Sequence, residues 1–190
     1  MRTITLVILL GVFPLLAPAG EPASQTPAKI RLAGIFLKGF AVWRNETPDC
    51  APPTDKPWMK LDCGLMKCPK PQLLGIPLEL DYSNWRNSPR MTEVEIDAGK
   101  PFAIRMGGAY VTASVSDAVA VITGGVATLH STSCVYDLKF TPRAGALYEA
   151  TIDPARGGGC FLRLSEIRAS DTGIYQRAAI EGAELKACGG

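Results

Sequence analysis

The chain has 190 residues, of which 47% are hydrophobic, and a formal net charge of +2. This length suits a single domain that can bury a real core without metals or disulfides. The near-balanced charge argues against a polybasic surface, so neither nucleic acid nor an acidic membrane is predicted as a partner, because phosphate binding needs clustered Lys and Arg.

The N-terminus has the layout of a secretory signal peptide over residues 1–19. Arg2 supplies a positive start, residues 4–16 are almost wholly apolar, and Ala17-Pro18-Ala19 offers small residues for cleavage. The apolar run is shorter than the ~20 residues that span a bilayer, so we expect no stable membrane insertion. An uncleaved amphipathic anchor is the alternative. The signal predicts a periplasmic or secreted protein, and residues 20–29 are expected to form a flexible leader.

Residues 30–43, IRLAGIFLKGFAVW, form a long apolar run that contains Gly34 and Gly39. Helix and strand both fit its periodicity, but the glycines, the aromatics and the β-branched start favour a strand bent at a glycine. Residues 44–74 are rich in proline and cysteine, which excludes most regular structure. We therefore predict a disulfide-tied insertion at 44–74 and regard it as the first suspect for function.

Downstream of the insertion the pattern indicates β-strands. Residues 75–82 predict a short strand, and residues 92–106 predict two strands around a turn at 97–100, because apolar and polar residues alternate on both sides of it. Beyond the turn, Arg105 alternates with the apolar Ile104 and Met106, so it lies on the opposite face. Two further strands are expected in the Val-, Thr- and Ala-rich residues 107–131, where residues 116–120 also fit a helical turn.

Three later runs alternate clearly with a period of two: residues 134–140, 148–152 and 160–164. In the first run, Cys134, Tyr136 and Leu138 share one face and Asp137 lies on the other. Pro- and Gly-rich turns separate them, so they predict an antiparallel meander of the kind found in β-sandwiches. In the C-terminal tail, Ser170 or Asp171 could cap a short helix, although nearby glycines weaken that helix.

All six cysteines lie downstream of the predicted signal: Cys50, Cys63, Cys68, Cys134, Cys160 and Cys188. An even number in an exported chain predicts three disulfides, and the sequence leaves about fifteen pairings open. If Cys134 and Cys160 both point inward, they can form a bond worth ~3 kcal/mol in the chain-entropy model. Cys188 is expected to tie the tail to the Pro-rich segment.

Metal binding is the rival interpretation of the cysteines, but His130 is the only histidine and CGLMKC lacks the spacing of a zinc or redox pair. No metal and no cofactor is predicted.

Phe140, Pro142, Gly145 and Tyr148 form an F-x-P-x-x-G-x-x-Y pattern between two cysteines near the C-terminus. This pattern resembles one found in small exported β-sandwich proteins of Gram-negative bacteria, and the likeness covers residues 93–168. The resemblance implies the fold and the compartment. It transfers no catalytic residues, because such proteins are mostly uncharacterised.

The loop LDYSNWRNSPR contains Tyr82, Trp85 and Arg86, which are residue types that stack on and hydrogen-bond to sugars or protein partners. Trp58, and with it Trp43, lies in or beside the Pro-rich segment and could join them. Tyr82, Trp85, Arg86 and Trp58 are therefore the candidate binding residues. The alternative is that each tryptophan plugs an end of the sandwich or covers a disulfide.

Other chemistry-bearing residues favour structural interpretations. Glu93, Glu95 and Asp97 share one strand face, which would suit a carboxylate-based hydrolase or a calcium site, but alternating acids also mark a solvated face. His130 lies near Cys134, yet residues four apart on a strand are about 13 Å apart. We expect a surface or structural histidine and no catalytic pair.

The predicted fold is all-β: one immunoglobulin-like antiparallel β-sandwich over residues 30–190, with seven or eight strands and a disulfide-tied Pro-rich segment. The predicted function is that of an exported binding or structural protein of the bacterial envelope, without catalysis. Its partner would be a protein, a peptide or an envelope glycan. The alternatives are an inhibitor of a cell-wall hydrolase or protease and, third, a hydrolase that uses Glu93 and Glu95.

Overall fold

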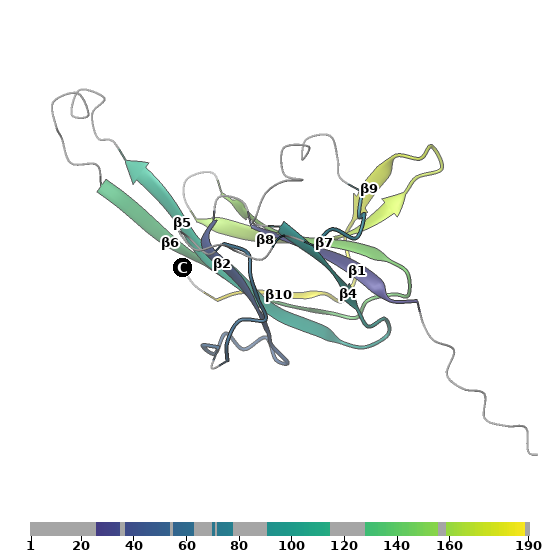
Figure 1. Ribbon diagram of the computed structural model, residues 1–190, viewed down its shortest axis with the longest axis horizontal. Helices are drawn as coiled ribbons and strands as arrows, with labels where there is room; N and C mark the ends of the chain where they lie inside the picture. Colours follow the sequence, from purple (N-terminus) through teal and green to yellow (C-terminus); the bar gives the residue numbers. More distant parts are fainter. Residues whose placement is uncertain are drawn as a thin grey trace, which may run out of the picture.

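The computed structural model describes residues 26–34, 37–53, 55–62, 70, 72–77, 91–114, 128–155 and 159–188. These residues form ten strands and no helix (Figure 1). The strands are β1 (Ala28–Gly34), β2 (Leu37–Arg44), β3 (Met59–Lys60), β4 (Met91–Ile96), β5 (Phe102–Ser114), β6 (Thr128–Phe140), β7 (Leu147–Pro154), β8 (Cys160–Ala169), β9 (Tyr175–Ala178) and β10 (Glu184–Ala187). The predicted signal peptide, Cys63, Cys68, Tyr82, Trp85 and Arg86 lie outside the described residues.

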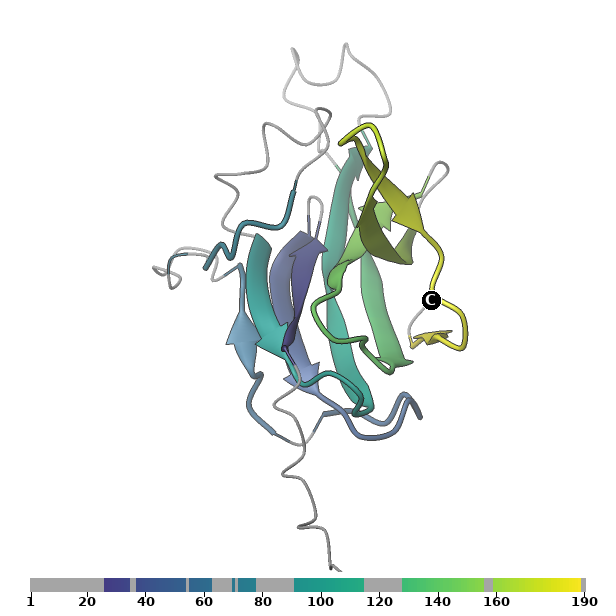
Figure 2. The same ribbon diagram turned by 90° about the vertical axis from the view of Figure 1, so that its right-hand side faces the viewer.

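The strands form two five-stranded sheets that pack face to face (Figure 2). The β1 sheet has the order β4-β1-β7-β8-β9, and the β5 sheet has the order β10-β6-β5-β2-β3. Every pair is antiparallel except β1 with β7, which is parallel. The predicted all-β sandwich is therefore confirmed, with ten strands among the described residues where seven or eight were expected.

The apolar run at residues 30–43 is two strands, and the prediction of one bent strand was wrong. β1 ends at Gly34 in the β1 sheet, and β2 begins at Leu37 in the β5 sheet. Gly34 is required at the crossing because a Cβ there would lie 2.9 Å from the Phe40 ring. The period-two pattern does not show this change of sheet, because it is the same in both sheets.

The predicted meander is also corrected. β7 and β8 form an antiparallel hairpin, but β6 lies in the opposite sheet and β7 pairs with β1. The segment between β6 and β7 is a corner held by Tyr148, whose hydroxyl accepts a 2.8 Å bond from the Arg143 N–H. The Tyr148 ring meets Phe140 edge to face at 4.8 Å, and Gly145 turns the chain with a φ of 69°. The F-x-P-x-x-G-x-x-Y pattern thus has a structural role in this chain.

The C-terminal tail forms strands, so the predicted short helix was wrong. Ser170 begins a tight turn instead: its hydroxyl accepts the Ile174 N–H at 3.1 Å, and Gly173 has a φ of 77°. β9 then returns along β8, and β10 joins the edge of the β5 sheet against β6.

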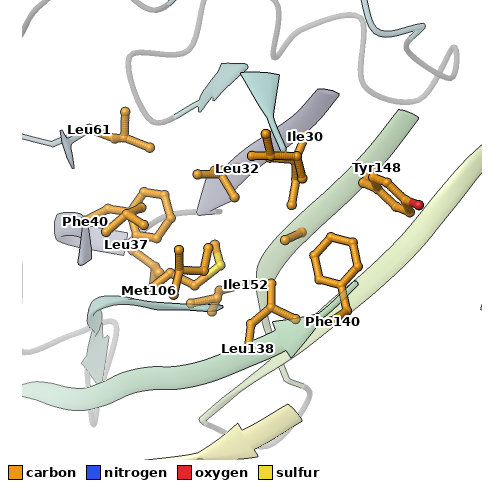
Figure 3. Packing of buried hydrophobic residues seen from close by; sticks show 14 of the residues in the cluster. Ile30, Leu32, Leu37, Phe40, Leu61, Met106, Leu138, Phe140, Tyr148 and Ile152 are labelled. Atoms are coloured by element: carbon orange, nitrogen blue, oxygen red, sulfur yellow. The ribbon is translucent and has the colours of Figure 1, made fainter. Parts of the chain in front are cut away.

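The core lies between the sheets and is made by the inward-facing residues of both (Figure 3). Cys134 of β6 and Cys160 of β8 form a disulfide across it, which confirms the predicted pair and ties the two sheets together. The fully buried side chains include Ile30, Leu32, Leu37, Phe40, Ile104, Met106 and Ile152.

Candidate functional site

A row of side chains crosses the outer face of the β5 sheet. The strand register places Trp43 of β2 beside Arg105 of β5, Arg105 beside Asp137 of β6, and Asp137 beside Lys186 of β10. Partners in adjacent strands project to the same face. Since the neighbouring Ile104 and Leu138 point into the core, this row faces away from it.

Arg105 and Asp137 form a buried bidentate ion pair in this row. The Arg105 Nε donates to Asp137 Oδ1 at 2.7 Å, and Nη2 donates to Oδ2 at 2.8 Å. Both side chains are buried although they lie on an outer face. The carboxylate keeps the pKa of Arg105 above its ordinary value. Burial acts to raise the pKa of Asp137, but the bonds from Arg105 and from the Cys50 N–H outweigh it, and the pKa is lowered.

The pair is buried by residues 45–58, which connect β2 with β3 and which we call the strap (residue 54 is not described). The Cys50 N–H donates to Asp137 Oδ2 at 2.9 Å, and the Ala51 carbonyl accepts a bond from Arg105. Cys50 is then joined by a disulfide to Cys188, which directly follows β10. The strap therefore leaves the β2 side of the sheet, reaches its β10 edge and returns to β3 (drawn in blue at the bottom of Figure 1).

This disulfide confirms that Cys188 ties the tail to the Pro-rich segment, and it identifies Cys50 as the partner. Among the described residues, only Cys50, Asp137 and Cys188 bring three metal-ligand atoms within 4.8 Å of one another. Two of these atoms are the sulfurs of the disulfide. A cysteine ligates metal as its thiolate, so the oxidised group is not a metal site.

A cleft of about 540 Å³ opens between the strap and the end of the β2–β5 pair. This volume falls within the ~300–1,000 Å³ of small-molecule sites. Its lining combines two tryptophans, two prolines and both signs of charge: Trp43, Arg44, Asn45, Glu46, Asp49, Ala51, Pro52, Pro53, Asp55, Lys56, Trp58 and Arg105.

Trp58, one of the predicted binding residues, is held in this cleft by two contacts. The guanidinium of Arg44 lies over the ring at 4.5 Å from its centroid, and the Phe102 ring meets it at 6.5 Å in an edge-to-face arrangement. Phe102 in turn packs on Phe140 at 5.9 Å. Trp58 therefore packs on the core, as the alternative interpretation expected, and its exposed part lines the cleft.

On the opposite sheet, the solvated face predicted for the acidic residues of β4 was only partly correct. Glu95 is exposed, but Glu93 is buried. The Arg31 Nη2 donates to Glu93 Oε1 at 2.7 Å, and the Ile76 N–H donates to Oε2 at 3.2 Å. Nη1 of Arg31 also donates to Glu149 at 2.9 Å. Both oxygens of Glu93 are therefore engaged in the fold.

The sequence did not identify the ion pair of Arg105 and Asp137 as part of a site. Arg105 and Asp137 were recognised only as the outward-facing members of alternating strands. The proline-rich strap beside them was the available signal that this face is covered. Tyr82, Trp85 and Arg86 are not described, and His130 is exposed on β6.

Comparisons with protein-family models, with curated proteins and with solved structures found no match. No helix in the described part of the chain is long and apolar enough to cross a membrane. The two disulfides indicate a compartment more oxidising than the cytosol.

Proposed function

We propose that the chain is an exported binding protein, periplasmic or secreted, whose ligand lies in the cleft beneath the strap. The observation that supports this most strongly is the way the strap is fastened. The disulfide, the Cys50 N–H bond to Asp137 and the Arg105 bond to Ala51 all hold its first half against the sheet. A pre-organised wall reduces the ordering cost of binding, which favours affinity.

The composition of the cleft supports the same proposal. Tryptophan and arginine are the side chains most enriched at binding hot spots, and here Trp43, Trp58 and Arg44 line one hollow. The proposal includes no catalytic step. Glu93, one of the two acidic residues considered for hydrolysis, is engaged in bonds from Arg31 and from the Ile76 N–H.

The proposal is tested by comparing how the wild type and Trp58→Ala bind a panel of candidate ligands. The panel contains neutral oligosaccharides and short acidic, basic and proline-rich peptides. Tryptophan fluorescence and calorimetry report binding. We expect at least one probe to bind and Trp58→Ala to weaken it about tenfold or more, which is ~1.4 kcal/mol.

Ile174→Ala is the matched control, because Ile174 is a large apolar side chain, 65% exposed, that does not line the cleft. It should bind like the wild type. If Trp58→Ala and Ile174→Ala bind every probe equally, the cleft is not the binding site.

A further inference from the structure

The charges of the cleft nearly cancel. Its lining has three acidic and three basic side chains, and one of the bases, Arg105, is already paired with Asp137. This leaves Glu46, Asp49 and Asp55 against Arg44 and Lys56, all exposed. Screening by water and salt weakens any remaining field at such positions. The cleft therefore lacks the single-signed field that would select a strongly charged ligand.

The cleft nevertheless has unused hydrogen-bonding groups of both kinds. Within the described part of the chain, Glu46, Asp55 and Lys56 form no hydrogen bond and no ion pair, while Asp49 Oδ1 accepts the Ala51 N–H at 2.9 Å. A carboxylate accepts several hydrogen bonds, and an ammonium group donates three. A ligand that carries many groups able both to donate and to accept would satisfy this set.

The two tryptophans, Trp43 and Trp58, provide an aromatic surface beside these polar groups, although Arg44 covers one face of the Trp58 ring. The edge-to-face contacts from Trp58 to Phe102 and from Phe102 to Phe140 connect the Trp58 ring to the core. An indole ring offers an apolar face for stacking together with a polar N–H group. A sugar ring matches both features, because it has C–H groups on its faces and hydroxyls around its edge.

We propose that the cleft binds a short uncharged oligosaccharide, with a sugar ring packed against the tryptophan surface and hydroxyls bonded to Asp55 and Lys56. This inference rests on the proposed function, since it names the ligand class of the same cleft. A basic or acidic peptide is the rival ligand, and the near-balance of charge argues against both.

The test titrates purified, disulfide-intact protein with chitotriose, cellotriose and maltotriose, and in parallel with a basic and an acidic peptide of similar mass. We expect at least one trisaccharide to bind. Its Kd should change less than about twofold when salt is raised from low to high concentration, because no net charge is neutralised. Trp58→Ala should weaken binding about tenfold or more.

Asp55→Ala and Lys56→Met each remove a polar group without threatening folding, because both side chains are exposed and unpaired within the described part of the chain. Each should weaken trisaccharide binding about threefold to tenfold, the range for one lost hydrogen bond. They change the charge in opposite directions, so a common loss identifies hydrogen bonding. Opposite effects would indicate an electrostatic ligand and would contradict the inference.

The remaining outcomes separate the two proposals. If only a charged peptide binds, and Trp58→Ala abolishes that binding, the oligosaccharide inference is wrong and the binding function stands. If a trisaccharide binds equally to wild type, Trp58→Ala and Asp55→Ala, the sugar site lies elsewhere and the inference is again wrong. If no probe binds in a Trp58-dependent way, both proposals fail.

Discussion

In the part of the chain that the structure describes, the outer face of each sheet carries a buried ion pair between an arginine and a carboxylate, but only the pair on the β5 sheet lies beside a cleft. Among the described residues, each face has one buried arginine that bonds at least one carboxylate of a neighbouring strand. Each arginine also donates to a backbone carbonyl of a segment that covers the face. On the β1 sheet, Arg31 bonds Glu93 and Glu149, and these side chains are at most 5% exposed. On the β5 sheet, Arg105 bonds the fully buried Asp137 but also faces Asp49, which is 55% exposed, at 3.9 Å.

The difference shows how a buried ion pair becomes part of a binding site. The Arg31 cluster is closed, because its carboxylates are bonded and buried. Arg105 lines the cleft, so the same kind of pair there anchors the strap and forms part of the wall of a hollow. Burying such charges is costly unless they are fully paired, so the pairs position the covering segments more than they stabilise the fold.

The largest loss of stability is expected at the buried cluster of Arg31, Glu93 and Glu149. Arg31→Met leaves two buried carboxylates, those of Glu93 and Glu149, without their shared cation. Glu149 keeps its bond to Arg177 and Glu93 keeps its backbone N–H donors, but Arg31 is the only partner of Glu93 with a charge among the described residues, and breaking a buried pair costs about 3–5 kcal/mol in comparable cases. The free energy of unfolding, measured by urea denaturation, should fall by that amount, while any ligand binding at the cleft should be unchanged in the folded fraction. Glu95→Gln, on the same strand but exposed, should change stability by no more than about 0.5 kcal/mol. Equal stability of wild type and Arg31→Met would mean that the Arg31 cluster is hydrated and open.

A smaller loss of stability, combined with a loss of binding, is expected at Arg105. Arg105→Met removes the bidentate partner of Asp137, but that carboxylate keeps the Cys50 N–H and lies beside an open cleft that admits water. We expect a loss of about 3 kcal/mol, at the lower end for a broken buried pair. Binding at the cleft should weaken about tenfold or more as the strap loosens.

Arg105→Lys sharpens this comparison, because it keeps the charge and loses the two parallel bonds. It should recover part of the stability and little of the binding. If Arg105→Met binds like the wild type, the strap does not depend on the ion pair, and the contrast between the two faces is not functional.

The sequence predicted the faces of these strands better than their surroundings. Alternation correctly placed Arg105 and Asp137 opposite the core, since a period of two fixes the face of every residue in a strand. Alternation cannot show what lies on that face. Burial of the pair depends on the strap and on the Cys50–Cys188 bond, and six cysteines alone do not determine their pairing.

The same limit explains the errors in topology. The run through Gly34 and the pattern from Phe140 to Tyr148 both appeared to be local β-structure, and both in fact carry the chain from one sheet to the other. A change of sheet depends on long-range contacts, such as the Phe40 ring against Gly34, that periodicity does not contain. The cleft could be anticipated only in part, from Trp58 and the prolines around it.

The smallest expected effect is a difference between the two faces in how the free energy of unfolding depends on pH. Asp153 of β7 is buried on the β1 sheet, where burial and the charge of Glu149 raise its pKa although Arg163 lowers it, whereas the pKa of Asp137 on the β5 sheet is lowered. A carboxyl whose pKa is raised on folding binds its proton more tightly in the folded state. Its contribution to stability is therefore present at low pH and is lost as the pH rises through the folded pKa.

Asp153→Asn removes this contribution, so the stability of the variant relative to the wild type should increase as the pH rises above about 4, by at most ~1.4 kcal/mol per pH unit. Denaturation at several pH values measures this slope. Asp137 has the opposite sign: its contribution is present above the ordinary carboxyl pKa and is lost as the pH falls through its lowered value. A relative stability of Asp153→Asn that is flat or falls with pH would show that Arg163 outweighs burial at this site. The buried carboxyl on the β1 sheet would then resemble Asp137 on the β5 sheet, whose pKa is lowered by its arginine.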